Sequence, residues 1–540
     1  MTRREPRRGT PSFVIALILM IALPLAPGVV AAGTALAFVR IPIESLVVIV
    51  LLALLPWRAA RIVVAVLFGV FVDIALVLAG LSAAFEYALG RPFDPTDLPQ
   101  ISDGYGVVKD SIGATASVLV VVLLAVIAVA VILGLTWSAL RVDAAFRRNR
   151  PRGRNLTIVA TAAWVVALLV GSQLIAGQPA AASASFQAIT SAVKSGSAAV
   201  AAQKNLPAEV ANDPYAKLPS SDLLTSLRGK DVIIAFVESY GQVAVQGTSF
   251  SKGVDKVLKQ GQSELAAHGY SDESAWLTSP TFGGLSWLAH STLQTGLWVN
   301  EAPTYSAVIR TKRFTLSDAF ADAGWNTVSD VPSDTQPWSF GTSFYHYDTL
   351  LDANNVGYEG PKFGYAQIPD QYTWQYFYDH ELAGPHQPVM AEIDTVSSHT
   401  PWAPLPQIVP TSQLGDGSIY DPQPAESESS DTVWQNPKTV QQFYGQSIQY
   451  SLKALYSFVD NSHDPNLVVI ALGDHQPATI VSGHDANHQV PITIIAKDPA
   501  VFHSISGWKW QAGDQPTSEA PLWPMSAFRN KFLSAFDKKP

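Results

Sequence analysis

Apolar side chains gather in the first third of the chain. Five runs of Val, Leu, Ile and Ala with few charges lie there. Each is about 20 residues long, which is the length of helix that crosses a bilayer. The pattern therefore predicts an N-terminal bundle of five transmembrane helices. The predicted spans are residues 12–32, 37–56, 61–82, 116–138 and 156–176.

Residues 37–56 allow a second interpretation, because Arg40 and Glu44 lie near the start of this run. A bundle of four spans that omits it is the alternative. The first run is long, has no clear cleavage site and is followed by further runs, so it is not predicted to be a signal peptide.

The charges between the runs predict which side of the membrane each segment occupies. Arginines precede the first run, and they also separate the second run from the third and the fourth from the fifth. The segment between the third and fourth runs is acidic instead. Because basic loops stay in the cytoplasm, five crossings place the N-terminus inside and everything after about residue 177 outside. The arginines are Arg3, Arg4, Arg7, Arg8, Arg58, Arg61, Arg141, Arg147, Arg148, Arg150, Arg152 and Arg154.

The second part of the chain has a different pattern. Apolar runs of strand length alternate with amphipathic helical patterns, which predicts an extracytoplasmic α/β domain with a mainly parallel sheet. The predicted strands are 231–239, 466–475 and 491–498, and the predicted helices are 315–325 and 440–461.

These patterns divide the chain into four predicted parts. A membrane domain occupies residues 1–177, and an Ala- and Ser-rich connector follows at 178–229. The α/β domain occupies 230–505, and residues 506–540 form a C-terminal extension.

Composition narrows the chemistry. Only 15% of the 540 residues are charged, which is low for a soluble protein at about 25%, and the net charge of −9 argues against a nucleic-acid partner. The chain has no cysteine. Disulfides, thiolate zinc sites, iron–sulfur clusters and a cysteine nucleophile are therefore excluded.

Two predicted strands end in residues that suit metal or phosphate chemistry. Glu238 ends the first strand, and Asp474 and His475 end a later one. In such sheets, ligands bind at the carboxyl ends of the strands. Between them lies the Gly-, Ser- and Thr-rich turn 279–298, which leads into a predicted helix. A hydroxyl at a helix N-terminus benefits from the backbone N–H groups there, as does a phosphate bound to it.

Three motifs resemble those of the alkaline-phosphatase superfamily in its sulfatase-like branch. They are VIIAFVESYG at 232–241, ALGDHQP at 471–477 and HTP at 399–401. The membrane-anchored lipoteichoic acid synthases and phosphoethanolamine transferases are the most similar groups. The resemblance implies that Glu238, Asp474 and His475 are metal ligands, and that His399 faces the substrate phosphate.

The same resemblance places the nucleophile by spacing. In sulfatases and nucleotide pyrophosphatases it lies ten residues before the Gly of a Leu-x-Thr-Gly-like segment, which here gives Ser286, ten residues before Gly296. Its Oγ is the fourth implied metal ligand. Thr281 and Ser279 remain alternatives, because threonine is the usual nucleophile in the transferases. His290 then falls where sulfatases carry Arg and nucleotide pyrophosphatases carry His.

The chain also departs from these families. Ser286 lacks the following Pro and Arg that formylglycine formation requires, which argues against sulfate ester hydrolysis. In segment 330–341, Trp338 matches a glycerol-phosphate-contacting Trp of the lipoteichoic acid synthases, but the accompanying His and Arg are absent. His346 and His484 are further candidates for binding phosphate or metal, with an ordinary surface or core position as the alternative for each.

The resemblance implies a multi-pass enzyme of the cell membrane. It would move a phospho-head-group, such as glycerol phosphate, from a membrane phospholipid to an envelope glycan or glycolipid through a covalent intermediate on a hydroxyl. One divalent metal ion is expected, Mn²⁺ first, with Zn²⁺ and Mg²⁺ as alternatives. A phosphodiesterase or sulfatase-type hydrolase and a non-catalytic envelope binding protein are the alternative functions.

Overall fold

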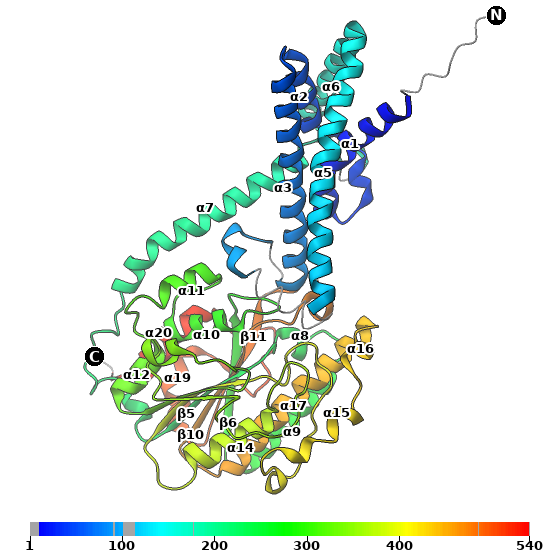
Figure 1. The fold of residues 1–540 in the computed structure, drawn as a ribbon. Coiled ribbons are helices and arrows are strands. Elements are labelled where there is room, and N and C mark those ends of the chain that lie inside the picture. The colour runs from blue at the N-terminus through cyan, green and yellow to red at the C-terminus, as the bar shows by residue number, and fades with distance from the viewer. Residues whose placement is uncertain (1–9, 90–91, 101–113, 176–177, 484, 539–540) are drawn as a thin grey trace, which may run out of the picture. The chain divides into compact units, whose positions relative to one another are not determined.

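The computed structural model describes residues 10–89, 92–100, 114–175, 178–483 and 485–538. The chain forms two compact units (Figure 1), the first of residues 1–86 and 91–202 and the second of residues 87–90 and 203–540. Arg3, Arg4, Arg7 and Arg8, on which the predicted orientation depends, lie outside the described residues.

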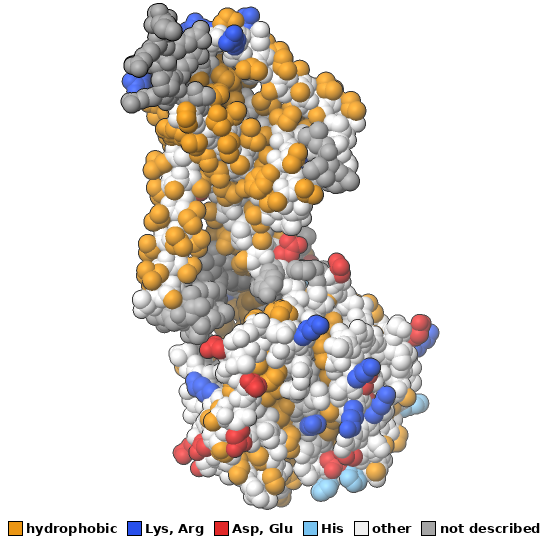
Figure 2. All heavy atoms as spheres, turned by 90° about the vertical axis from the view of Figure 1, so that its right-hand side faces the viewer, with side chains coloured by type: hydrophobic (Ala, Val, Ile, Leu, Met, Phe, Trp, Pro, Cys, Tyr) orange, Lys and Arg blue, Asp and Glu red, His pale blue; other side chains and the backbone are white. Residues whose placement is uncertain are grey.

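The first unit contains helices that are long and apolar enough to cross a membrane. They are α1 (Thr10–Ala32), α3 (Arg58–Leu89), α5 (Ala114–Arg148) and α6 (Arg150–Val170). Many of their large apolar side chains point outward, as Leu119 and Leu124 of α5 do at 64% and 60% exposure. Figure 2 shows the apolar surface that results. Such a surface is stable only against lipid, so the chain is a membrane protein.

The predicted second span is shorter than expected. Residues 37–56 contain the end of a 3₁₀ turn (Ala35–Phe38), the short strand β1 (Ile41–Pro42) and the 12-residue helix α2 (Ile43–Leu54). A helix of that length extends about 18 Å, against a hydrocarbon core of about 30 Å. Glu44 in its first turn accepts a hydrogen bond from the backbone N–H of Phe186 at 3.1 Å. The number of crossings and the orientation stay predictions.

The second unit is built on one mixed sheet of nine strands. Pairing is parallel between β10 and β5, β5 and β9, β9 and β7, and β7 and β8, whereas β11 is antiparallel to both β10 and β6. The predicted fold class is confirmed. The strand order is β12 (Gln511–Ala512), β6 (Ser271–Thr278), β11 (Gln489–Ala496), β10 (Leu467–Gly473), β5 (Asp231–Val237), β9 (Val389–Thr395), β7 (Asn326–Val331) and β8 (Thr349–Asp352), with β13 (Leu522–Pro524) beside β6.

Helices cover both faces of this sheet (Figure 1). Strand β5 explains why, because its seven residues are all buried and its side chains alternate between two cores. Ile233 and Val237 join the core under α9, α14 and α17, and Ile234 and Phe236 join the core under α10, α12, α19 and α20. Whether or not they pack on the sheet, the helices after residue 183 are α7 (Ala184–Ala211), α8 (Gln242–Val245), α9 (Ser251–Ala267), α10 (Ser286–Thr295), α11 (Ala302–Val308), α12 (Leu316–Ala323), α13 (Ser339–Ser343), α14 (Asp370–Phe377), α15 (Gln423–Glu426), α16 (Ser430–Val433), α17 (Pro437–Ser462), α18 (Thr479–Ser482), α19 (Pro499–Ile505) and α20 (Phe528–Phe536), and most of α7 belongs to the first unit.

A buried ion cluster joins the C-terminal helix α20 to the start of the second unit. The Asp213 carboxylate accepts from Arg529 at 2.7 Å and lies 3.2 Å from the Arg313 guanidinium, and all three side chains are buried. Removing the shared carboxylate strands two buried cations, which costs about 3–5 kcal/mol.

We therefore expect Asp213→Ala to lower the free energy of unfolding of this unit by about that amount. Denaturant unfolding followed by tryptophan fluorescence measures it. Asp222→Ala is the matched control, because its ion pair with Lys538 is largely exposed and such pairs contribute about 0–1 kcal/mol. Equal losses in the two variants would contradict this account of the cluster.

Candidate active site

The register of two strands brings Glu238 and Asp474 together. Strands β5 and β10 pair in parallel up to Val237 and Gly473, so the next residue of each lies beside the other at the carboxyl end of the sheet. A Cβ on Gly473 would lie 1.9 Å from the carbonyl oxygen of Tyr240, so only glycine permits this approach.

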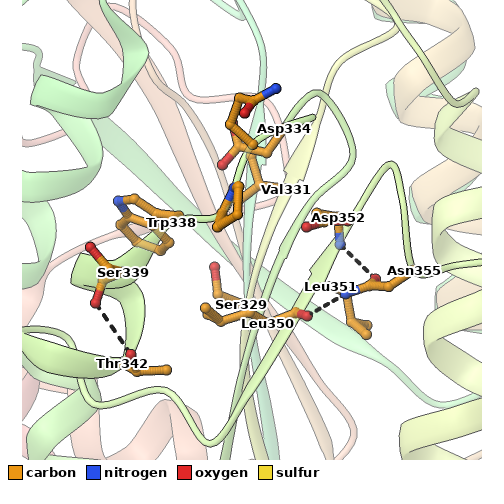
Figure 3. A pocket seen from close by; sticks show the side chains of 12 residues that line it. Ser329, Val331, Asp334, Trp338, Ser339, Thr342, Leu350, Leu351, Asp352 and Asn355 are labelled. Atoms are coloured by element: carbon orange, nitrogen blue, oxygen red, sulfur yellow. Dashed lines mark hydrogen bonds between the residues drawn. The ribbon is translucent and has the colours of Figure 1, made fainter.

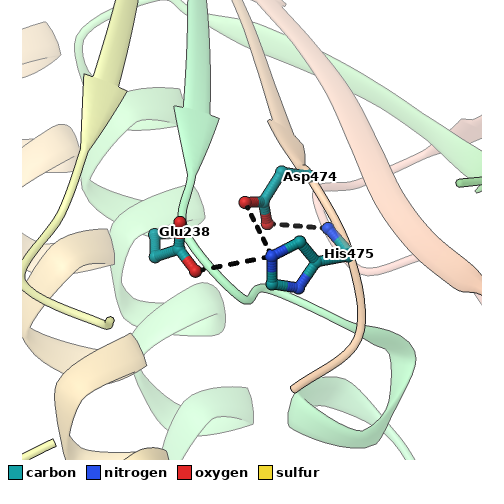
Figure 4. A group of neighbouring side chains, drawn as sticks. All are labelled: Glu238, Asp474 and His475. Carbon is teal, nitrogen blue, oxygen red and sulfur yellow. Dashed lines mark hydrogen bonds and ion pairs between the residues drawn. The ribbon is translucent and has the colours of Figure 1, made fainter. Parts of the chain in front are cut away.

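His475 completes this group, which Figure 4 shows from close by. Its Nε2 lies 3.6 Å from Glu238 Oε1 and 3.3 Å from Asp474 Oδ2, and all three side chains are buried. Its Nδ1 is 2.8 Å from the carbonyl oxygen of Gln476 and must donate to it. In the neutral ring, Nε2 then carries a lone pair directed at two carboxylates, which is the arrangement of a metal-binding histidine.

The two carboxylates are held differently. Asp474 Oδ1 accepts from the backbone N–H groups of Ser239 and His475, each at 2.7 Å, whereas its Oδ2 is buried without a hydrogen bond from the described residues. Burial and the charge of Glu238 raise the pKa of Asp474 to about 7. Burial alone would raise the pKa of Glu238 as well, but His399 and His475 hold it well below its ordinary value.

These residues fit a divalent cation. One atom from each of Glu238, Asp474 and His475 can be chosen so that all lie within 4.8 Å of one another. A buried carboxylate oxygen without a partner costs free energy unless a cation or a proton satisfies it. Two carboxylates and one imidazole are ligands that Mn²⁺, Zn²⁺ and Mg²⁺ sites can use.

Ser286 also contacts this group. Its Oγ lies 3.0 Å from Glu238 Oε2 and 3.2 Å from His475 Nε2. The preceding turn needs unusual backbone angles: Gly283 and Gly284 have φ of 70° and 156°, and Leu285 has φ of 64°. Leu285 is a non-glycine residue in this left-handed region, so its backbone is strained. The turn ends there, and Ser286 is the first residue of α10.

The alternative nucleophiles lie elsewhere. Ser279 Oγ donates to the carbonyl oxygen of Asp474 at 2.5 Å, and Thr281 Oγ1 is 3.5 Å from Ser279 Oγ. Both side chains are buried, and within the described residues neither hydroxyl hydrogen-bonds to Glu238 or His475. The structure thus brings Ser286, and not Thr281 or Ser279, to the predicted metal ligands.

A cavity of about 300 Å³ opens in front of Ser286. His399 lines it, with the ring stacked on Tyr365 at 3.7 Å and Nδ1 donating to the carbonyl oxygen of Thr400 at 2.5 Å. Tyr365 and Asp334 also line this cavity, and the sequence alone did not indicate either of them. Asp334 lies in the segment 330–341 that contains Trp338, but no sequence feature singles out either residue, and the folded chain brings both to the cavity.

His290 belongs to a second group of titratable side chains, two of which, His290 and Asp394, line this cavity. Its Nδ1 lies 3.5 Å from Glu392 Oε1 and 3.3 Å from Asp394 Oδ2, and its ring stacks on Phe236 at 3.9 Å. Burial alone disfavours the imidazolium, but Asp394 and Glu392 outweigh it and raise the pKa of His290 to about 9. The two acids occupy alternate positions of β9, and that spacing in VMAEIDT is the one sequence signal that could have revealed them.

This pairing should make stability depend on pH. Because the folded pKa of His290 is above its unfolded value of about 6.5, its contribution is fully present below about pH 6.5 and is lost as pH rises through about 9. We expect the thermal midpoint of the wild type to fall from pH 7 to pH 10, and His290→Gln to remove part of that fall. His346→Gln is the control, because that ring is 59% exposed beside Asp318. Parallel curves for wild type and His290→Gln would contradict the pairing.

The other predicted residues lie outside this cavity. Trp338 lines a neighbouring cavity. His346 Nδ1 is 2.5 Å from Asp318 Oδ1 and its ring is exposed, so the structure does not bring it to the site. His484 lies outside the described residues.

Comparison with solved structures finds the groups that the motifs resemble. The phosphoethanolamine transferase EptA of Neisseria meningitidis is 14% identical over 98% of this chain and 95% of its own, with a TM-score of 0.47. The phosphoglycerol transferase GacH of Streptococcus pyogenes is 14% identical over 62% of this chain and 82% of its own, with a TM-score of 0.38. The lipoteichoic acid synthase LtaP of Listeria monocytogenes is 14% identical over 58% of this chain and 74% of its own, with a TM-score of 0.35.

No family model and no curated protein matches the chain. These solved proteins come from the groups that the motifs at 232–241, 399–401 and 471–477 resemble. Because the likenesses are distant, we infer the function from the geometry of the site.

Proposed function

We propose that this protein is a metal-dependent phosphotransferase of the cell membrane. It moves a phospho-head-group, such as glycerol phosphate, from a membrane phospholipid to a hydroxyl of an envelope glycan or glycolipid. One observation carries the proposal. Ser286 begins a helix, and its hydroxyl lies within 3.2 Å of both Glu238 Oε2 and His475 Nε2, in the same group as the Asp474 carboxylate oxygen that accepts no hydrogen bond from the described residues.

The residues around Ser286 divide the work. One divalent cation would be held by Glu238, Asp474, His475 and Ser286 Oγ. Its positive charge would lower the pKa of the Ser286 hydroxyl and balance the negative charge of the phosphoryl group. The N-terminus of α10 presents backbone N–H groups to the phosphoryl oxygens. Ser239 donates to Glu238 Oε1 at 2.7 Å and keeps the other oxygen directed at Ser286.

Transfer then takes two displacements at phosphorus. Ser286 Oγ attacks the lipid phosphate, and the bond to the diacylglycerol oxygen breaks. His399 lines the cavity and is placed to hold the phosphoryl oxygens or to protonate the departing oxygen. An acceptor hydroxyl next displaces Ser286 and carries the head group away. The apolar helices of the first unit suit a donor that keeps its acyl chains in the bilayer.

Release of diacylglycerol tests the proposal. The full-length protein in lipid nanodiscs is supplied with Mn²⁺, Zn²⁺ or Mg²⁺ and with phosphatidylglycerol or phosphatidylethanolamine. We expect diacylglycerol and a mass increase of the protein equal to one phospho-head-group. Free head group without such an adduct would favour the hydrolase, and no lipid cleavage in any combination would favour the non-catalytic protein.

A further inference from the structure

A second cavity adjoins the one in front of Ser286. It has a volume of about 290 Å³ and lies at the carboxyl ends of β7 and β8 (Figure 3). Val331 and Asp334 line both cavities. A ligand in the second cavity would therefore lie next to whatever is bound at Ser286.

The chemistry of the second cavity suits an uncharged polyhydroxyl ligand. Asp334 and Asp352 supply carboxylate oxygens, Ser329 supplies a hydroxyl, and the half-buried ring of Trp338 supplies an aromatic face. Among the described residues that line it, none is Lys, Arg or His. Carboxylates accept hydrogen bonds from sugar hydroxyls, and an aromatic ring packs against the apolar face of a sugar ring. A second phosphate would meet only negative charge here.

The volume sets the size of the ligand. Cavities that hold drug-sized molecules measure about 300–1,000 Å³. At about 290 Å³, this cavity suits one small ring and not an extended oligomer. The shared wall at Asp334 leaves one end of such a ring facing the site of phosphoryl transfer.

Two hydrogen bonds hold the backbone of Asp334 in place, and its carboxylate is left to face the cavity. Its backbone N–H donates to Val331 at 2.9 Å and its carbonyl accepts from Ala353 at 3.0 Å. Within the described part of the chain, its side chain makes no hydrogen bond. Burial, and then the charges of Asp394 and Asp352, raise the pKa of Asp334 to about 6. It is thus mostly ionised at neutral pH and a stronger base than an ordinary aspartate.

We propose that the second cavity binds the acceptor as a single uncharged sugar ring, and that Asp334 is the general base for the attacking hydroxyl. The inference rests on the proposed phosphotransferase function. The acceptor oxygen forms its bond to phosphorus as the bond between phosphorus and Ser286 Oγ breaks. The acceptor proton passes to the Asp334 carboxylate, and the electron pair of the broken bond returns to Ser286 Oγ.

Two measurements on the full-length protein in sugar-free nanodiscs test this, with methyl glucoside as the probe. Saturation-transfer NMR measures binding without any chemistry, and we expect Trp338→Ala to weaken the sugar signal at least about five-fold. In the second measurement, the protein is first incubated with phosphatidylglycerol to form the adduct, and loss of the adduct, which we call discharge, is then followed over time. We expect methyl glucoside to accelerate discharge until its effect saturates. Asp334→Asn should slow discharge about 100-fold while adduct formation changes little. Asp322→Asn, an exposed carboxylate on α12, is the control.

The outcomes separate this inference from the proposed function. Discharge that saturates with ethanolamine but not with methyl glucoside would overturn the sugar site in favour of an ammonium site. Unchanged discharge in Asp334→Asn would overturn its role as a base. If no adduct forms in any protein, the phosphotransferase proposal fails, whereas the NMR measurement still decides whether the cavity binds sugar.

Discussion

Ser286→Ala is expected to reduce lipid cleavage at least about 10⁴-fold, because the hydroxyl that attacks phosphorus is gone. The alanine keeps the start of α10 intact, so the thermal midpoint should change little. Diacylglycerol release in nanodiscs measures the effect. Lipid-dependent mass increase of the protein should disappear with it, since among the described residues Ser286 has the hydroxyl that hydrogen-bonds to both Glu238 and His475.

Thr281→Ala and Ser279→Ala are the matched controls, because each removes one hydroxyl from the same turn. Ser279 donates to the carbonyl oxygen of Asp474, so its loss should lower stability and slow the reaction modestly without preventing the adduct. If Thr281→Ala lost the adduct while Ser286→Ala kept it, Thr281 would be the nucleophile and the assignment to Ser286 would be wrong.

Removal of the metal is expected to have the second large effect. Chelation should abolish lipid cleavage and also lower the thermal midpoint, because Glu238 and Asp474 are then left buried without a cation. Asp474→Asn removes one charged ligand, so we expect metal affinity to fall at least about 100-fold and the midpoint to lose its dependence on added metal.

Isothermal titration with Mn²⁺ and elemental analysis of the purified protein measure metal binding directly. Asp379→Asn, which changes an exposed carboxylate, controls for the loss of negative charge. Full metal content in Asp474→Asn would show that the cation binds at another place in the protein. The group of His290, Glu392 and Asp394 would then be the next place to look.

The sequence predicted the strands with continuous apolar runs better than the strands that carry acidic side chains. Glu238 and Asp474 follow apolar runs whose residues are buried on both faces, so their strands were evident. Strand β9 was not predicted, because the acidic side chains Glu392 and Asp394 make VMAEIDT look half polar. The run at 491–498 was predicted as a strand, but side-chain pattern does not encode that β11 runs antiparallel to β10.

The site residues also divide into those that motifs identified and those that only the folded chain reveals. Motif resemblance named the four residues that converge at Ser286, because each lies next to a strand end or a helix start. Glu392 and Asp394 lie on β9 just before the HTP motif, and Asp334 lies in segment 330–341, but only the pairing of β9 with β5 and β7 brings these carboxylates to the site. The short second helix also differs from expectation, because Pro42 precedes it and Glu44 is held by Phe186.

Peptide mapping of the protein after reaction with lipid identifies the residue that attacks phosphorus. Full-length wild-type protein is incubated with metal and phosphatidylglycerol, quenched in acid, digested and analysed by tandem mass spectrometry. We expect one phospho-head-group adduct on the peptide that contains Ser286, with fragment ions that place it on that residue. An adduct on Thr281 or Ser279, or lipid cleavage with every hydroxyl of this turn unmodified, would contradict it.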